Sequence, residues 1–536
     1  MGTHERWTSR PAAIAAATVV FPPLGLVLIW ASGGLRLWKK LAATLAALVA
    51  GVLWAHLVLG WHVVLDGSGR PRIAFTSPAR HYAALEQQRA AQAGADAPLR
   101  SAPAETPPSV ASEDPASAAE VPSTRVSADA TSTPADDPAA ATMPVGRGMA
   151  PFWTDFRGPR RDGHYTERAL ALPWPASGPR EVWRQPVGAG YASFVVAGAR
   201  LFTIEQRRRQ EVVAAYDIET GREVWTDAWD AEFREFMGGD GPRSTPTWHD
   251  GRLYALGATG EFRAFDAASG RVLWSRNILD DNGATNLQWG MAASPLVVDD
   301  LVIVLPGGPG GRSVVAYHRV TGAPVWRALD DQAAYASPMV VTLAGVRQLL
   351  VMSASRAMGL AIEDGSLLWE YPWTTMYNVN AAQPIVVDEG RVFLSSGYGK
   401  GAALVEVARE DGRFAARAVW ENIGMKNRFS SSVLHEGVVY GLDEGILGAV
   451  DVMTGERHWK AGRYGHGQVL LASGHLLVLT EDGDLVLVRA TPERHDEVSR
   501  VSSLRGKTWN VPALADGRLF VRNTTEMAAY DLRGGR

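Results

Sequence analysis

The chain has 536 residues and a formal net charge of −4, so it lacks the surplus of basic residues that nucleic-acid-binding proteins carry. It contains no cysteine, which excludes disulfides, thiolate metal ligands, a cysteine nucleophile and covalent haem attachment. Composition divides the chain into a membrane anchor at 1–66, a linker rich in Pro, Ala and Ser at 67–150, and a domain rich in Trp and Gly at 151–536.

Two apolar stretches without Asp, Glu, Lys or Arg, residues 11–35 and 41–65, occupy the N-terminal region. Each is long enough to cross a hydrocarbon core about 30 Å thick, so we expect two transmembrane helices. Pro22 and Pro23 interrupt the first stretch. A cleaved signal peptide or a re-entrant segment is therefore the alternative for residues 11–35.

Basic residues between the two stretches predict the orientation of the anchor. Arg36, Lys39 and Lys40 are expected to remain in the cytoplasm by the positive-inside rule. With two spans, both termini then lie outside the inner membrane, and the C-terminal domain lies in the periplasm or another extracytoplasmic space. Arg6 and Arg10 favour the cytoplasm for the N-terminus and weigh against this arrangement.

The segment that follows the anchor is predicted to be a flexible tether. Residues 83–142 consist mainly of Ala, Pro, Ser, Thr, Asp and Glu, with almost no aromatic residues. Such a composition buries too little apolar surface to offset the entropy lost on ordering. We therefore expect residues 67–150 to be a disordered linker.

A short phrase recurs through the rest of the chain: a small residue, an aromatic residue, Asp, then Thr-Gly or Ser-Gly, and Trp four residues after the Gly. Clear copies run from Ala215 to Trp225, Ala264 to Trp274, Ala316 to Trp326 and Ala449 to Trp459, and weaker copies end at Trp369 and Trp420. The spacing of about 40 to 50 residues is typical of a four-stranded propeller blade. The tryptophans are interpreted as packing residues between blades.

Eight inner strands can be counted along this region. They are placed at Tyr191, Thr245, Ser294, Ser337, Gln383, Ser431, Gln468 and Val511. The last copy has no terminal Trp, whereas residues 178–183 read as an outer strand that has no blade before it. We therefore predict an all-β, eight-bladed β-propeller whose N-terminal strand closes the ring, preceded by two transmembrane helices and the linker.

The phrase Ala-Tyr-Asp-x-x-Thr-Gly-x-x-x-Trp resembles the repeat of the pyrroloquinoline-quinone (PQQ) family of eight-bladed propellers, and the resemblance covers roughly residues 178–532. That family includes quinoprotein alcohol dehydrogenases and the propeller lipoprotein of the outer-membrane β-barrel assembly machinery. The resemblance therefore implies the fold and leaves the activity open.

The loops that lead into the inner strands, and those between the second and third strands of each blade, gather at one mouth of the channel, where propellers ordinarily bind ligands. Candidate ligand-binding residues in these loops are Glu205, Arg243, Trp289, Asn380, Lys426, Arg463, Trp509 and Arg522. The four basic residues would meet carboxylates of an anionic ligand, and the Trp rings would stack on it. The alternative is that neighbouring acids neutralise these cations, as Glu205 would neutralise Arg207.

As a quinoprotein, the chain would hold PQQ with Ca²⁺. The resemblance and the order along the chain nominate Glu205, Asn286 and Asn380 as calcium ligands and Asp330 or Asp331 as the general base. The adjacent cysteines that such dehydrogenases usually carry above the cofactor are absent. The histidines, His466 among them, show no metal-ligand spacing and are expected in turns or on the surface.

These observations favour a membrane-anchored, extracytoplasmic propeller that binds a small anionic ligand or a protein partner at its channel mouth, with no nucleic acid involved. The alternative is a PQQ-dependent alcohol or sugar dehydrogenase.

Overall fold

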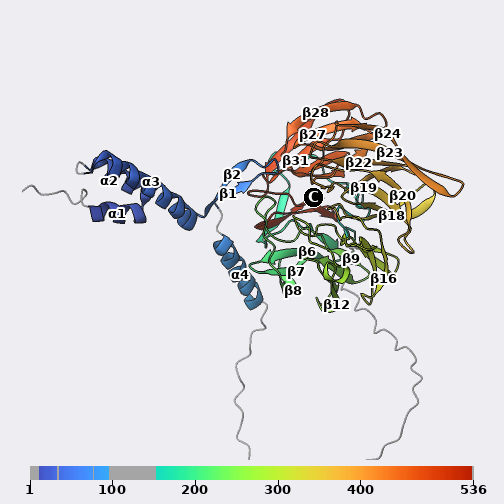
Figure 1. Ribbon diagram of the computed structural model, residues 1–536, viewed down its shortest axis with the longest axis horizontal. Helices are drawn as coiled ribbons and strands as arrows, with labels where there is room; N and C mark the ends of the chain where they lie inside the picture. Colours follow the sequence, from blue (N-terminus) through green and yellow to red (C-terminus); the bar gives the residue numbers. More distant parts are fainter. Residues whose placement is uncertain (1–10, 33–34, 76–77, 96–151, 534–536) are drawn as a thin grey trace, which may run out of the picture.

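The computed structural model describes residues 11–32, 35–75, 78–95 and 152–533. Within these ranges, eight sheets of four or five strands surround a common axis, and a separate two-stranded hairpin and four α-helices precede them (Figure 1). The C-terminal part of the chain is therefore an eight-bladed β-propeller, as the repeat predicts.

Each blade is an antiparallel meander whose first strand lines the axis. The first four blades are β5 (Val195–Ala197), β6 (Arg200–Arg207), β7 (Gln210–Asp217) and β8 (Glu223–Asp230); β9 (Thr247–His249), β10 (Arg252–Leu256), β11 (Glu261–Asp266) and β12 (Val272–Asn277); β13 (Leu296–Val298), β14 (Leu301–Val304), β15 (Val314–His318) and β16 (Pro324–Ala328); β17 (Met339–Leu343), β18 (Val346–Met352), β19 (Arg356–Leu360) and β20 (Leu367–Pro372).

The fifth, sixth and seventh blades continue the pattern, and the eighth takes its outer strand from the N-terminal side. They are β21 (Ile385–Asp388), β22 (Arg391–Ser396), β23 (Gly401–Glu410) and β24 (Arg413–Asn422); β25 (Val433–His435), β26 (Val438–Asp443), β27 (Ile446–Asp451) and β28 (Arg457–Arg463); β29 (Gln468–Ala472), β30 (His475–Leu479), β31 (Asp484–Arg489) and β32 (Glu497–Ser502), extended by β3 (His164–Tyr165); and β33 (Ala513–Ala515), β34 (Arg518–Arg522), β35 (Glu526–Asp531) and β4 (Arg180–Pro186).

The repeated Trp and Gly residues join neighbouring blades. Trp225 of the first blade donates its indole N–H to the carbonyl of Ala267 in the second, at 3.1 Å. A Cβ on Gly270 of that same turn would lie 2.6 Å from the Trp225 ring, and Gly270 has a φ of 77°. Glycine is therefore needed at position 270 for two reasons: the backbone is left-handed there, and a side chain would collide with the Trp225 ring.

Trp369 of the fourth blade departs from this pattern. Its indole donates to Oε1 of Gln348 within its own blade, at 2.6 Å. The next blade replaces the Thr-Gly turn with a long hairpin, β23–β24, that turns at Asp411 and Gly412. The carbonyl that the other tryptophans use is thus missing from that turn.

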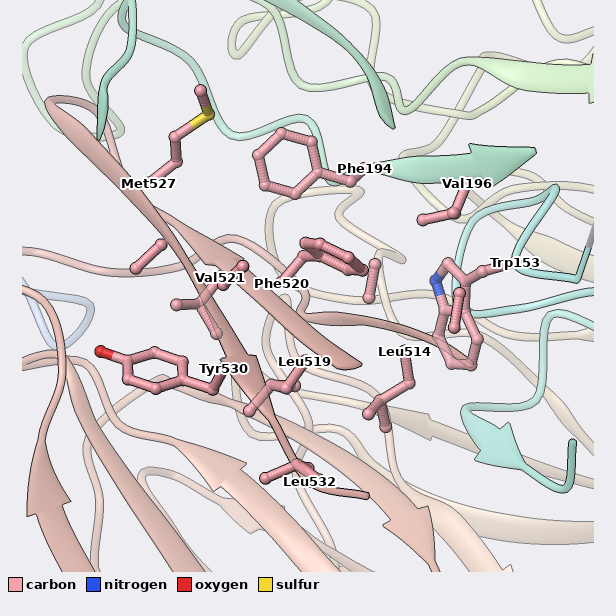
Figure 2. Close-up of a cluster of buried hydrophobic side chains, with 14 of the residues drawn as sticks. Trp153, Phe194, Val196, Leu514, Leu519, Phe520, Val521, Met527, Tyr530 and Leu532 are labelled. Carbon is pink, nitrogen blue, oxygen red and sulfur yellow. The ribbon is translucent and has the colours of Figure 1, made fainter. Parts of the chain in front are cut away.

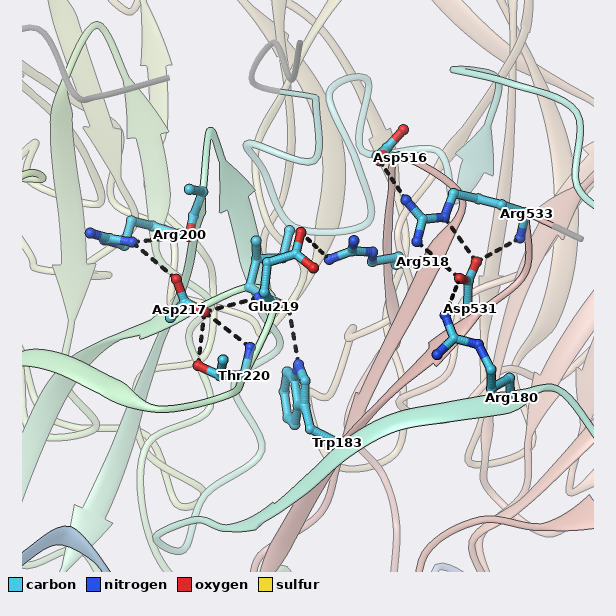
Figure 3. A network of polar contacts seen from close by, with 12 residues as sticks. Arg180, Trp183, Arg200, Asp217, Glu219, Thr220, Asp516, Arg518, Asp531 and Arg533 are labelled. Carbon is cyan, nitrogen blue, oxygen red and sulfur yellow. Dashed lines mark hydrogen bonds and ion pairs between the residues drawn. The ribbon is translucent and has the colours of Figure 1, made fainter. Parts of the chain in front are cut away.

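Strand β4 pairs antiparallel with β35 and is the outer strand of the eighth blade. Figure 3 shows the seam: Arg180 binds Asp531 at 2.6 Å, and Trp183 donates to the carbonyl of Ile218 in the first blade at 3.0 Å. Arg518 of the last blade also reaches Glu219 of the first, at 2.7 Å. The two ends of the propeller are therefore linked by both main-chain and side-chain bonds.

A large apolar core supports this seam. Trp153, Phe194 and Phe520 are fully buried, and Figure 2 shows them together with Leu514 and Val521. The cluster combines side chains from the first, seventh and eighth blades with Trp153 from the segment before them. The N-terminal strands thus belong to the core of the propeller.

The predicted first transmembrane helix is not continuous. Residues 11–31 form two short helices, α1 (Pro11–Val20) and α2 (Pro22–Ala31), which pack against each other and against α3 (Leu37–Trp54). Pro22 lacks an N–H and its ring excludes the backbone of the preceding turn, so the helix stops at Phe21. Each short helix spans about 15 Å, half of a hydrocarbon core.

Side-chain contacts define how these short helices lie on α3. Phe21 packs edge-on against Trp54 with centroids 5.7 Å apart, and Trp30 donates to Thr44 at 3.1 Å. α2 therefore runs antiparallel to α3. Within the described residues, one helical stretch, Leu37–Val58, is long and apolar enough to cross a membrane.

The region predicted as a linker begins with ordered elements. Strands β1 (Trp61–Leu65) and β2 (Pro71–Phe75) form a hairpin, and α4 (Pro78–Ala95) follows; both contact the propeller. The apolar run to residue 65 therefore ends in a strand, because the helix stops at Gly60, whose φ is 70°. The predicted disorder of residues 96–150 lies outside the described residues.

Candidate functional site

A hydrogen-bond circuit defines the mouth of the channel. In successive blades, one residue just before the inner strand donates its backbone N–H to the side chain of the equivalent residue in the next blade, at distances of 2.6 to 3.0 Å. In chain order, these residues are Ser193, Thr245, Ser294, Ser337, Gln383 and Ser431, each donating to the next. Two residues before each equivalent position of the eight blades stand Tyr191, Arg243, Ala292, Tyr335, Ala381, Phe429, His466 and Trp509. We call these eight positions the mouth ring.

Trp509 is the centre of an aromatic cluster in the mouth ring. Its ring lies 4.6 Å from Phe429 and 5.2 Å from Tyr191, and its indole N–H donates to Oε1 of Glu481 at 2.9 Å. The Nζ atom of Lys507 sits 4.0 Å above the Trp509 ring. Burial, followed by repulsion from Arg243, lowers the pKa of Lys507 to about 8.

His466 belongs to this cluster and is buried, contrary to the prediction of a turn or surface histidine. Its ring packs 5.4 Å from Phe429, and its backbone N–H donates to Oε2 of Glu481 at 3.0 Å. Burial lowers its pKa. Neither Phe429 nor Glu481 was among the candidates, although Phe429 stands two residues before an inner-strand Ser, as Tyr335 does.

Three of the four predicted anion-binding cations, Arg522, Lys426 and Arg243, are bound by the protein itself. The guanidinium of Arg522 is fully buried and donates to Oγ1 of Thr203 at 2.7 Å and to the carbonyl of Gly188 at 2.9 Å. Lys426 forms an ion pair with the buried Asp443 at 2.8 Å. Arg522 in particular ends strand β34 and holds adjacent blades together.

Arg243 and Arg463 have different surroundings. Arg243 donates to the carbonyls of Gly241 and Gly239, both at 2.6 Å, and lies 5.4 Å from the Tyr191 ring. Burial lowers its pKa. Arg463 is exposed at the end of β28 and lines a cavity of about 200 Å³ between the β1–β2 hairpin and the propeller. The four cations thus occupy four unlike environments.

The nominated calcium ligands also have separate partners. Glu205 is buried and binds Arg207 at 2.5 Å; burial opposes its ionisation, but Arg207 and Arg522 lower its pKa overall. Asn380 donates to the carbonyls of Ser353 and Trp373, and Asn286 donates to that of Ala258.

No group of three His, Asp or Glu residues in the described part of the chain is arranged to hold a metal ion. Of the oxygens that Ca²⁺ would need, the Glu205 carboxylate pairs with Arg207 and Oδ1 of Asn380 accepts from Ser396, whereas Oδ1 of Asn286 is buried without a hydrogen-bond partner among the described residues. Two of the three nominated ligands are thus already engaged within the protein.

The two candidate general bases differ as well. Asp330 is exposed and accepts the backbone N–H of Gly311 at 2.7 Å. Asp331 is buried and paired with Arg356 at 2.5 Å; burial raises its pKa, but the bonds from Arg356 and Ser353 lower it overall. A carboxylate held in an ion pair is a weak general base.

Trp289, the remaining candidate for stacking on a ligand, lies near the mouth ring, 5.8 Å from Tyr335.

Two arginines fill the channel beneath the mouth ring. Arg161 is buried and donates to the carbonyls of Ser294 and Pro338, at 3.2 and 2.9 Å. Arg157 donates to those of Val469 and Ser432, at 3.2 and 3.1 Å. Because these carbonyls come from four blades around the ring, both guanidinium groups lie near the axis. The segment that precedes the first blade thus places two buried guanidinium groups against the inner strands of four blades.

Four exposed apolar side chains on the mouth face are not singled out by the repeat. Phe236, Met376, Tyr377 and Ile423 are 72%, 75%, 62% and 70% exposed. Each lies in a loop that leads from an outer strand to the next inner strand, which places all four on the side of the mouth ring. Their signal in the sequence is a large apolar residue in a loop that otherwise reads as polar.

Known proteins resemble this chain over most of the propeller. The outer membrane protein assembly factor BamB of Bordetella pertussis is 22% identical over 370 residues, which are 61% of this chain and 92% of that protein. The crystal structure of BamB from Moraxella catarrhalis is 16% identical with a TM-score of 0.48, and covers 67% of this chain and 98% of its own.

Quinohemoprotein alcohol dehydrogenase from Comamonas testosteroni is 12% identical, with a TM-score of 0.51, over 72% of this chain and 81% of its own. At that identity the likeness shows the fold alone. The family profile described as outer membrane protein assembly factor BamB matches residues 175–284 and 209–461, together more than half of the chain. The chain therefore belongs to the PQQ-repeat β-propeller family of that description.

Proposed function

We propose that this chain is a membrane-anchored, extracytoplasmic scaffold that binds a protein partner through the mouth face of its propeller. The observation that carries the proposal is the group of exposed apolar residues Phe236, Met376, Tyr377 and Ile423. Protein-binding surfaces typically expose large apolar side chains, and these four belong to loops on one face of the propeller. The related protein of Bordetella pertussis, which is named an outer membrane protein assembly factor, agrees with a role in assembly.

The binding of a small anionic ligand has less support. Arg522, Lys426 and Arg243 already donate to carbonyls or to Asp443, so a ligand would have to displace those partners. A PQQ-dependent dehydrogenase has less support for a similar reason, since two of its nominated calcium ligands, Glu205 and Asn380, are bound to other residues of the protein. Such a dehydrogenase would also need a separate protein or membrane quinone to accept the electrons from its reduced cofactor.

A single span explains the charge pattern of the anchor better than two. If Leu37–Val58 alone crosses the membrane, Arg6, Arg10 and Arg36 precede the span, and Lys39 and Lys40 lie in its first turn at the same end. The positive-inside rule assigns that side to the cytoplasm, with α1 and α2 re-entering from it, and puts the propeller outside. We propose the inner membrane as the site of the anchor.

The partner surface is tested by replacing Phe236, Met376 and Ile423 together with Asp. The full-length protein is solubilised from its native membrane, and the mass of its complex is measured by native electrophoresis and mass spectrometry. We expect the complex to dissociate, because each truncated anchor in an interface weakens binding by about 2 kcal/mol, or roughly 30-fold.

The control carries Asp at Val224, Val325 and Val419, which are exposed on outer strands. It should keep the complex intact. A wild-type chain that migrates as a free protein, or a control that dissociates equally, contradicts the proposal. Stoichiometric binding of PQQ with Ca²⁺, measured by absorbance and followed by dye reduction with alcohols, supports the dehydrogenase instead.

A further inference from the structure

The β1–β2 hairpin follows the membrane helix almost directly. One residue, Gly60, separates Leu59 at the end of the helical stretch from Trp61 at the start of β1. The turn of the hairpin is closed by Asp66, whose carboxylate accepts the N–H groups of Ser68 and Arg70 at 2.9 and 2.8 Å. The hairpin is thus a short extension of the membrane helix.

The tip of the hairpin binds the mouth ring. Gly67 donates its N–H to Oε1 of Glu481 at 2.5 Å, and its carbonyl accepts from Arg428 at 2.8 Å. Ser68 contacts Nε2 of His466 at 3.2 Å. Glu481 is buried and also accepts from Trp509, so the hairpin shares a carboxylate with the aromatic cluster. Such charge-assisted bonds are the stronger ones in proteins.

An ion pair and a close approach add to this contact. Arg72 on β2 binds Asp482 in the loop between β30 and β31. A Cβ on Gly67 would lie 2.7 Å from Cβ of His466, so that position accepts only glycine while the imidazole is present. The contact is therefore specific in shape as well as in charge.

Helix α4 binds a second part of the propeller. Leu85 is buried, and Arg89 donates to the carbonyl of Pro186 at 2.8 Å while lying 5.1 Å from the Tyr216 ring. Glu86 accepts two bonds from Arg208, at 2.6 and 2.9 Å. Gln92 also reaches Gln185 on β4, at 3.2 Å. α4 thus spans the seam between the eighth and first blades.

From these contacts we infer that the β1–β2 hairpin (residues 61–75) and helix α4 (residues 78–95) form a collar that binds the rim of the propeller and holds it beside the membrane helix. Residues 96–151 then join α4 to Phe152, and both of these are packed on the propeller. The distance between the propeller and the membrane is therefore set by the collar and not by the length of this segment. This inference rests on the proposed membrane anchor but not on the proposed partner surface, since the collar leaves the exposed apolar loops uncovered.

The absence of native cysteine makes the collar directly testable by disulfide formation in the full-length, membrane-embedded protein. Gly67→Cys with His466→Cys brings two thiols together, because the two Cβ positions would lie 2.7 Å apart. A disulfide needs about 3.5 to 4.5 Å, so the hairpin has to move back by only about 1 Å for the bond to form. The control is Gly69→Cys with His466→Cys, since a Cβ on Gly69 has no neighbour within 4 Å. Both proteins lose the same imidazole, so differences report on the hairpin alone.

We expect the first pair to close at least about tenfold faster than the control under mild oxidation, because a docked hairpin gives a high effective concentration of its thiol. The readout is electrophoretic mobility without reductant. Equal rates in the two pairs would show that the hairpin is free and would overturn the inference.

Helix α4 is tested separately by limited trypsin digestion of the full-length protein. Leu85→Asp should release the helix and raise the rate of cleavage at Arg89 by about tenfold or more, because a protected site is cut only when it opens. Ala84→Asp, at an exposed neighbouring position, should leave the rate unchanged. A wild-type protein that is cleaved at Arg89 as fast as Leu85→Asp contradicts the docking of α4.

Discussion

Arg522 and Arg463 are both predicted to lie in loops at the channel mouth, yet the structure gives them opposite surroundings. Arg522 is buried at the end of β34, where its guanidinium donates to Thr203 and Gly188. Arg463 is exposed at the end of the outer strand β28. Arg522→Ala should therefore destabilise the fold by about 3 kcal/mol, because it leaves buried acceptors without donors, and Arg463→Ala should stay within about 0.5 kcal/mol. Denaturant unfolding of the full-length protein in detergent measures both.

The structural role of Arg522 also has a clear contrary outcome. If Arg522→Ala unfolded at the wild-type denaturant concentration and instead lost affinity for a dicarboxylate, the residue would be a ligand contact. Burial lowers the pKa of Arg522, although nearby Glu205 favours its charge. The guanidinium remains charged at neutral pH and needs its acceptors.

At the scale of elements, the outer strand β4 decides whether the ring closes. Deleting residues through Gln185 removes this strand from β35 and takes Trp183 away from the first blade. Deletion through Thr142 keeps it. The first truncation should unfold at a lower temperature by about 10 °C or more, because it exposes an edge and part of the largest apolar core. Differential scanning calorimetry of the two proteins compares them.

The shorter deletion also removes the collar, so its melting temperature measures the propeller without residues 61–95. Restoring closure by fusing residues 178–186 behind the C-terminus of the longer deletion is the matched control. Recovery of the melting temperature would assign the loss to β4. Equal melting temperatures for the two original truncations would contradict closure by this strand.

At the scale of the whole molecule, a single transmembrane helix predicts that the two ends of the anchor lie on opposite sides of the membrane. A reporter enzyme that requires export should be active when fused after Leu65 and inactive when fused before residue 11, because the basic residues 36, 39 and 40 stay inside. Export of both fusions would support two spans. Activity of neither would place the propeller in the cytoplasm.

The sequence by itself determined the architecture of the propeller. The Thr-Gly and Trp positions repeat because each blade makes the same local contact with the next, as Trp225 does with Ala267 and Gly270. Such contacts depend on residues close in sequence or one repeat apart. Periodicity therefore reveals them without coordinates.

Only the tertiary structure decided the surroundings of the candidate site. Whether Lys426 meets a ligand or Asp443, and whether Glu205 meets a metal or Arg207, depends on distances between side chains that no repeat encodes. The docking of Gly67 on Glu481 joins residues 414 positions apart. Long-range contacts of this kind have no periodic signature, because each is made once and by side chains that differ from blade to blade.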